Sequence, residues 1–298
     1  MSATSALSTT DALQLFLLDC QARRLTASTL TFYRIKVASF LRWLAAQEVT
    51  GLDAITSTHI KRWLVSMQDR GLTDNSQHDY ARAVKTFLGY CVRDELLEKS
   101  PFAKVKMPTL GESLPVILLD AEIKTVLQKV KHQRNRLIVR FILDSGVRAA
   151  ELLALNVGDV DLQTGVVTIM IGKQQKGRLT SIGATTRKEL KRYLLLRKSP
   201  GVKEPLIAVL TRKATRLTMV GLMHAFRKMQ GQTSIDHLTA HTLRRTMATK
   251  SLSAGMDAYI LSRMLGHADM QMMRRYAAMN KELIQEQAER FSVVDNLE

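Results

Sequence analysis

Apolar residues recur at helical spacing through the first hundred residues of the chain. The earliest segment shows the pattern most simply, because its apolar side chains fall on one helical face: Leu13, Phe16, Leu17 and Cys20. Turn residues separate the successive segments, and the predicted helices cover residues 11–22, 28–47, 57–70 and 73–93. Ser57 or Thr58 is the expected cap of the third helix, and Thr73 or Asp74 that of the fourth. The pattern predicts a bundle of four or five helices.

The second half of the chain combines helical periodicity with one segment rich in β-branched residues. Residues 165–171, GVVTIMI, predict a strand, and residues 178–182 predict its antiparallel return after the turn sequence QQKG. The remaining periodic segments predict helices, at residues 120–130, 134–145, within 146–155, 184–197, 217–229 and 281–291. The predicted fold class is therefore mainly α, with one small antiparallel β-sheet in the second domain.

A short segment without periodicity separates the two halves. It contains Pro108, Gly111 and Pro115, which favour turns and extended backbone over helix. We expect a helical domain at residues 1–105, a linker at 106–114 and a second domain at 115–298.

Positive charge is concentrated after the predicted linker. The net charge of the chain is +17, and residues 106–298 hold 31 Lys and Arg against 17 Asp and Glu. An excess of this size indicates a polyanionic partner, although a solvated basic surface on an unrelated protein is the simpler alternative. The first domain has basic clusters only at residues 23–24 and 61–62, so by itself it also fits a protein-binding module.

Several kinds of site have no support in the sequence. Cys20 and Cys91 lack the spacing of metal ligands or of a redox pair, and both are expected in the core of a reduced, cytoplasmic protein. No apolar run approaches the roughly 18 residues of a membrane span, so no membrane partner is expected. The sequence has no phosphate-binding glycine loop and no acidic metal cluster, so we expect neither a cofactor nor a metal ion.

The candidate chemistry lies near the end of the chain. His241 and Arg244 are three residues apart on a predicted helix, so an imidazole and a guanidinium can reach one phosphate together. His267 follows a short apolar run, and Tyr276 lies nine residues beyond it. Taken singly, Tyr276 also fits a buried core tyrosine and His267 a helix-end residue. Together with the nearby cations, the Tyr276 phenol is a candidate nucleophile.

Two further motifs precede this stretch. SGVRAAEL contains Arg148, and IGKQQKGR contains Lys173 on the predicted hairpin. With HTLRR, LGHAD and the Tyr276 that follows, these ordered motifs resemble the signature of the tyrosine recombinases, the phage-integrase and Xer-type family of site-specific DNA recombinases. The resemblance spans most of residues 114–290, and the first hundred residues match only in size and helical character.

The resemblance implies six catalytic residues: Arg148, Lys173, His241, Arg244, His267 and Tyr276. Tyr276 would attack a DNA phosphodiester, leaving a covalent 3′-phosphotyrosine and a free 5′-hydroxyl. The two arginines would stabilise negative charge on the phosphate, since each guanidinium donates two parallel hydrogen bonds and stays protonated. Lys173 would protonate the leaving 5′-oxygen, His241 would exchange a proton with the phenol, and His267 would donate to the phosphate.

Three neighbouring residues bear on this set. Lys176 or Arg178, on the same hairpin as Lys173, could replace Lys173 as the acid. Glu151, one helical turn after Arg148, is expected to hold neighbouring groups in place and not to act as an acid.

The resemblance also implies an assembly. A homotetramer would act on double-stranded DNA with inverted core half-sites, exchange strands through a Holliday junction, and use accessory DNA-bending proteins where the system has them. The first domain would be a SAM-like core-binding domain, residues 281–291 would dock on a neighbouring subunit, and the protein would associate with the nucleoid. Ala240 and Arg245 replace residues common in the family, Pro and His. We therefore expect a recombinase for integration, excision or resolution of a mobile element, and not a housekeeping Xer protein.

Two other functions stay open on the sequence alone. A type IB topoisomerase uses the same chemistry without site preference, and a DNA-binding protein of the same fold could have lost catalysis. The complete set of candidate residues favours the recombinase.

Overall fold

The computed structural model of the chain describes residues 7–109, 116–170, 177–209 and 215–266. The chain divides into two compact units, Met1–Ser113 and Leu114–Glu298. Each unit has its own cluster of buried apolar side chains. Two separate cores are what a chain of this length can support.

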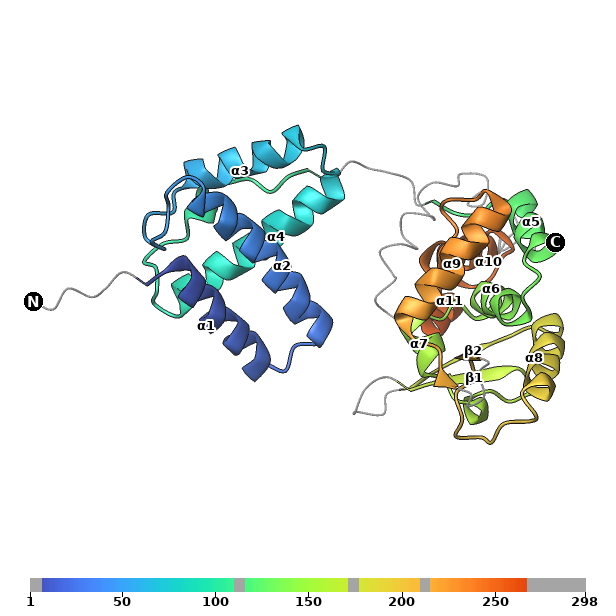
Figure 1. Cartoon of the computed structure of the whole chain (residues 1–298). Helices are drawn as coiled ribbons and strands as arrows, with labels where there is room; N and C mark the ends of the chain where they lie inside the picture. The colour runs from blue at the N-terminus through green and yellow to red at the C-terminus, as the bar shows by residue number, and fades with distance from the viewer. Residues whose placement is uncertain (1–6, 110–115, 171–176, 210–214, 267–298) are drawn as a thin grey trace, which may run out of the picture. The chain divides into compact units, whose positions relative to one another are not determined.

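The first unit is a bundle of four α-helices followed by a 3₁₀ helix (Figure 1). Its elements are α1 (Thr9–Ala22), α2 (Ala27–Ala45), α3 (Ser57–Asp69), α4 (Asp74–Arg93) and η1 (Pro101–Lys104). These helices confirm the prediction from apolar periodicity. Before each α-helix, a hydroxyl oxygen accepts a hydrogen bond from a first-turn backbone N–H, at Ser8, Thr26, Thr56 and Thr73.

The predicted cap of α3 was wrong by one or two residues. Thr56, and not Ser57 or Thr58, is the cap, because Thr56 has extended backbone and exchanges hydrogen bonds with His59. The Thr56 hydroxyl accepts from the His59 N–H, and the Thr56 N–H donates to His59 Nδ1, both at 3.3 Å. This reciprocal pair fixes the start of the helix.

Aromatic side chains fill the core of the first unit. The Phe16 ring lies 5.1 Å from Tyr33, 5.6 Å from Phe87 and 5.4 Å from Tyr90, measured between ring centroids. The two cysteines, Cys20 and Cys91, are fully buried, which confirms their prediction as core residues. Val105 and Met107 also pack against this core. Met107 belongs to the predicted linker at residues 106–114, so the first residues of that linker pack on the first unit.

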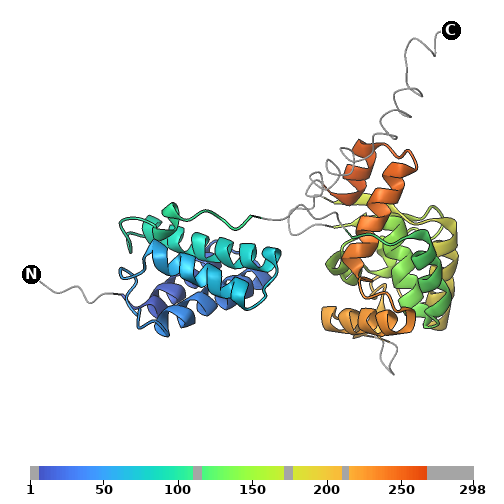
Figure 2. The ribbon, with the colours of Figure 1, turned by 90° about the horizontal axis from the view of Figure 1, so that it is seen from above.

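The described part of the second unit is mostly helical, and α6 lies at its centre (Figure 1). Its helices are α5 (Asp120–Lys129), α6 (Gln133–Ser145), α7 (Ala149–Ala154), η2 (Val157–Asp159), α8 (Ala184–Leu196), α9 (Met219–Thr233), α10 (Ala240–Ser253) and α11 (Ala258–Leu265). α6 packs between α8 and α10, with fully buried residues along its length: Leu137, Ile138, Val139, Phe141 and Ile142. α9 runs along one edge of the unit (Figure 2).

The predicted hairpin is present. β1 (Val166–Ile169) pairs antiparallel with β2 (Arg178–Ser181), and Ile169 lies opposite Arg178. The turn between them, residues 171–176, lies outside the described residues. A second pair of strands, β3 (Ala208–Val209) and β4 (Thr215–Arg216), was not predicted. The expectation of a single sheet was wrong because two-residue strands are too short to show an alternating pattern.

No helix among the described residues combines the length and the apolar character needed to cross a membrane.

Replacing Phe16 by Ala tests the aromatic core of the first unit. Loss of a fully buried ring should lower the free energy of unfolding of this unit by about 3–5 kcal/mol. Both tryptophans of the chain, Trp43 and Trp63, pack in this unit, so tryptophan fluorescence during urea unfolding measures it separately. Leu18→Ala, on the same helix at a side chain 60% exposed, is the control and should change the midpoint little. Equal shifts in the two variants would contradict the described packing.

Candidate active site

Arg148 follows a turn that only glycine fits well. α6 ends at Ser145, and Gly146 has a φ of 62°, in the left-handed region that glycine adopts without strain. A Cβ on Gly146 would lie 2.5 Å from Leu265 Cδ2 and 3.1 Å from Met247 Sδ. α10 and α11 therefore approach this turn closely, and the chain enters α7 with Arg148 as its N-cap beside them.

The Glu151 carboxylate joins two arginines that are distant in the sequence. Arg148 Nη1 donates to Glu151 Oε1 at 3.0 Å, and the Arg148 backbone N–H donates to Oε2 at 2.7 Å. Arg178, from β2, donates through Nη1 and Nη2 to the same two oxygens, at 2.7 and 2.6 Å. The expectation that Glu151 holds its neighbours in place is confirmed.

These contacts set the charge of Glu151. Burial alone would raise the pKa of the Glu151 carboxyl, but hydrogen bonds from Arg178 and Arg148, with the positive charge of Arg178, lower it to about 2. Glu151 is therefore ionised at neutral pH. An ionised carboxylate in this position orients both guanidinium groups.

Arg178 faces the interior, and its place in the strand was not anticipated. Along β2, Arg178 and Thr180 are buried, whereas Leu179 between them is 61% exposed. Arg178 Nε also donates to the Met264 carbonyl at 2.8 Å, and Thr180 Oγ1 donates to the Ser145 carbonyl at 2.7 Å. Arg178 is thus bound to α7 and α11, and these contacts do not support the alternative that it replaces Lys173 as a proton donor.

Arg244 is held between the ends of two helices. It lies on α10 and is 2% exposed. Its Nη1 donates to the Gly146 carbonyl, and its Nη2 donates to the Leu265 carbonyl at 2.7 Å. Carbonyl oxygens at helix C-termini carry partial negative charge, which stabilises a guanidinium there. His241 lies one turn earlier on the same helix with its side chain exposed, so the predicted helical placement of this pair is confirmed.

Gly266 brings the end of α11 to the two other arginines. It has a φ of 85°, and a Cβ at this position would lie 3.6 Å from Arg178 Nη1 and 3.7 Å from Arg148 Nη1. Residues from four separate segments therefore meet at one place: Arg148, Arg178, Arg244 and Gly266. Gly266 immediately precedes His267 in the sequence.

Three predicted site residues lie outside the described residues: Lys173, His267 and Tyr276. The predicted helix at 281–291 lies there too. The catalytic roles of these three residues, and of Arg148, His241 and Arg244, stay predictions. Within the described residues, no group of three or more His, Cys, Asp or Glu side chains could hold a metal ion.

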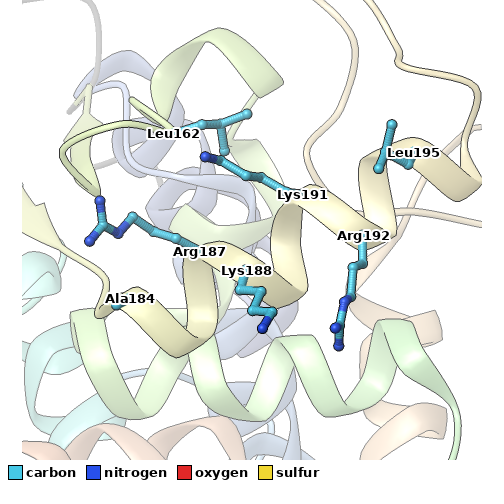
Figure 3. Close-up of a pocket in the computed structure, with 7 residues that line it drawn as sticks. All are labelled: Leu162, Ala184, Arg187, Lys188, Lys191, Arg192 and Leu195. Atoms are coloured by element: carbon cyan, nitrogen blue, oxygen red, sulfur yellow. The ribbon is translucent and has the colours of Figure 1, made fainter.

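A second basic feature covers the outer surface of α8 (Figure 3). Four cationic side chains line a shallow hollow of about 300 Å³ there: Arg187, Lys188, Lys191 and Arg192. The other lining residues are Leu162, Ala184 and Leu195, so no carboxylate lies among them. Glu189 points to the other side of the helix and pairs with Arg136 and Arg140, each at 2.7 Å. This surface increases the positive potential around the second unit.

Comparison with known proteins identifies two domains. Residues 117–282 match the model of the phage integrase family, and residues 5–95 match the phage integrase N-terminal SAM-like domain. Tyrosine recombinase XerC of Bacillus licheniformis is 27% identical over 269 residues, covering 86% of this chain and 87% of the relative. Tyrosine recombinase XerD of Pseudomonas putida is 28% identical over 275 residues, covering 88% and 90%.

A solved structure has the same fold across nearly the whole chain. It is the integrase of transposon Tn1549 in complex with a circular intermediate DNA. The TM-score is 0.73 at 18% identity, and the match covers 94% of this chain and 99% of the other. The mainly helical fold class with small antiparallel sheets is thereby confirmed.

The low pKa of Glu151 makes the stability of the second unit depend on pH. Because its folded-state pKa, about 2, lies below the ordinary value of 4.5, Glu151 stabilises the fold fully above pH 4.5 and loses this effect as the pH falls toward 2. A shift of this size corresponds to about 3 kcal/mol at neutral pH. Glu151→Gln should therefore lower the free energy of unfolding at pH 7 by that order, with a smaller loss at pH 3.5.

Urea unfolding followed by circular dichroism at the two pH values measures this difference. Asp236→Asn, at an exposed carboxylate of the same unit, is the matched control and should show no comparable gap. A loss for Glu151→Gln that is the same at both pH values would contradict the ion-pair explanation.

Proposed function

The chain belongs to the phage integrase family, and from this premise we propose that it is a tyrosine-type site-specific recombinase that cuts and rejoins DNA through a covalent 3′-phosphotyrosine. One observation supports this most directly. Arg244 donates to the Gly146 and Leu265 carbonyls, and Arg148 Nη1 would lie 3.7 Å from a Cβ built on Gly266, so two arginines from separate parts of the sequence lie at the end of α11. Two fixed guanidinium groups in one place suit a single phosphate.

The two arginines would stabilise the transition state. As a nucleophile adds to phosphorus, negative charge increases on the non-bridging oxygens, and preorganised cationic donors lower the energy of that state. A guanidinium suits this role because it remains protonated at any working pH. The arginines would thus supply electrostatic stabilisation that metal ions supply in many other phosphoryl-transfer enzymes.

The remaining steps are assigned from the sequence motifs. Tyr276 Oη would attack phosphorus while the bond from phosphorus to the 5′-oxygen breaks, and the phenolic proton would pass to His241. Lys173 would donate a proton to the departing 5′-oxygen, and His267 would donate a hydrogen bond to the phosphate. The phosphotyrosine bond retains the energy of the cut phosphodiester, so a 5′-hydroxyl from another strand can reverse the step without ATP.

Both units would bind double-stranded DNA. The first unit matches an integrase N-terminal domain and exposes its basic clusters at residues 23–24 and 61–62. The second unit contains Arg148 and Arg244 and the basic surface of α8. Sequence-independent attraction to phosphates would supply much of the affinity and make it sensitive to salt.

Tyr276→Phe tests the nucleophile. Wild-type protein mixed with duplex DNA nicked just beyond a candidate cleavage position should form an adduct that survives denaturation, because the short 5′-hydroxyl fragment diffuses away after attack. The Tyr276→Phe variant lacks the phenolic oxygen, so it should bind the same duplex and form no adduct. Denaturing gels measure the adduct, and gel shifts measure binding.

Two outcomes would favour a function other than recombination. Tight, salt-sensitive binding without an adduct on any cognate site would favour a DNA-binding protein that has lost catalysis. Relaxation of a supercoiled plasmid lacking any target site would favour a type IB topoisomerase.

The working assembly would be a homotetramer on two duplexes with inverted half-sites, passing through a Holliday junction. We place its role in integration, excision or resolution of a mobile element, with DNA-bending proteins as accessory factors and the nucleoid as its location. Residues 281–291 would dock on a neighbouring subunit, because Ile284, Ala288 and Phe291 fall on one helical face.

Deletion after Met279 tests the proposed assembly. The shortened chain should bind a single half-site normally and fail to form the four-subunit complex, since the docking segment is gone. Light scattering of the DNA complexes measures the stoichiometry. An unaltered tetramer would exclude this docking role.

A further inference from the structure

We propose that Arg178 is a positioning residue for strand cleavage: it holds the Glu151 carboxylate so that Glu151 orients Arg148 without cancelling the positive charge that the phosphate needs. The inference rests on the proposed function, since it concerns the same reaction. It assigns a role to a side chain that the six predicted catalytic residues do not include.

The geometry shows which arginine Glu151 binds more closely. Arg178 reaches both carboxylate oxygens with its two terminal nitrogens, at 2.7 and 2.6 Å. The Arg148 side chain reaches Oε1 at the longer distance of 3.0 Å. The Arg178 side chain is 8% exposed, whereas that of Arg148 is 38% exposed. The buried fork of Arg178 is the principal partner of the carboxylate, and Arg148 faces a more open environment.

Charge explains why this division matters. Glu151 contributes one negative charge, and Arg148 and Arg178 contribute two positive charges, so the three side chains together carry a net positive charge. Without Arg178, the partly buried Glu151 carboxylate would have Arg148 as its remaining cation in this group. The two would then form a neutral pair, and attraction to the DNA phosphate would fall. A carboxylate largely removed from water favours such pairing.

A second contact connects Arg178 to the end of α11. Arg178 Nε donates to the carbonyl of Met264, two residues before Gly266. Because Arg178 is also the first residue of β2, it links the strand that follows the hairpin turn to the segment that precedes His267. One side chain therefore fixes the relative positions of β2, α7 and α11.

A double-mutant cycle separates the charge effect from simple packing. The variants are Arg178→Met, Glu151→Gln and the two combined, and the measurements are the single-turnover rate of adduct formation at saturating nicked duplex and the Kd for that duplex. Arg178→Met should lower the cleavage rate by about 10²-fold, the order seen when one charge-stabilising donor is lost. The Kd should change by less than about tenfold, since the other phosphate contacts remain.

Recovery in the double variant is the decisive result. Removing Glu151 together with Arg178 leaves Arg148 without the competing carboxylate, so the double variant should cleave at least about tenfold faster than Arg178→Met. Arg178→Lys keeps the positive charge but loses the two parallel guanidinium donors, so its cleavage rate should lie between those of wild type and Arg178→Met. Arg263→Met, at an exposed arginine of α11, is the matched control and should cleave at the wild-type rate.

The outcomes distinguish this inference from the proposed function. A double variant as slow as Arg178→Met, with both proteins folded by circular dichroism, would overturn the inference and leave the recombinase proposal intact. The same holds if Arg178→Met cleaves normally. If wild-type protein binds the duplex and forms no adduct, the proposed function fails, and this inference fails with it.

Discussion

The candidate site depends on one partly buried carboxylate, that of Glu151, shared by two guanidinium groups. Glu151 accepts hydrogen bonds from Arg148 and Arg178, and the arginines come from the start of α7 and the start of β2. An ionised carboxylate removed from water is unfavourable unless it is paired and hydrogen-bonded. The hydrogen bonds of Glu151 form only when these elements are in register, so the requirement to pair this partly buried charge fixes the orientation of Arg148.

Arg244 is fixed differently, by main-chain carbonyls. The Gly146 and Leu265 oxygens lie at the C-terminal ends of α6 and α11, and Arg244 donates to both. The close approach of these helix ends requires a glycine at position 146, for both its backbone conformation and its lack of a Cβ. Together the two arrangements place a paired arginine and a carbonyl-bound arginine around α11, beside the residue that precedes His267.

Sequence reasoning reached most of the helices and part of the site. Apolar periodicity located α1 to α4, the Thr73 cap marked the start of α4, and β-branched residues located β1. Motif order selected six catalytic candidates; the structure describes the positions of Arg148, His241 and Arg244, and the catalytic roles of all six remain predictions. The inward position of Arg178 was not predicted, because a buried Arg beside the exposed Leu179 reverses the polarity that strand alternation normally shows. Only tertiary contacts with Glu151 and Met264 explain that reversal.

The two kinds of contact, to a main-chain carbonyl and to a carboxylate side chain, predict different patterns of sequence variation among homologues. The main-chain carbonyls that bind Arg244 are present whatever side chain a residue carries, so position 265 can vary without loss of that hydrogen bond. The contact between Arg178 and Glu151 joins two side chains, so a change in either one alone removes the ion-pair partner of the other at this site. Among homologous sequences, positions 151 and 178 should therefore vary together, whereas Arg244 should stay constant while position 265 drifts independently of it.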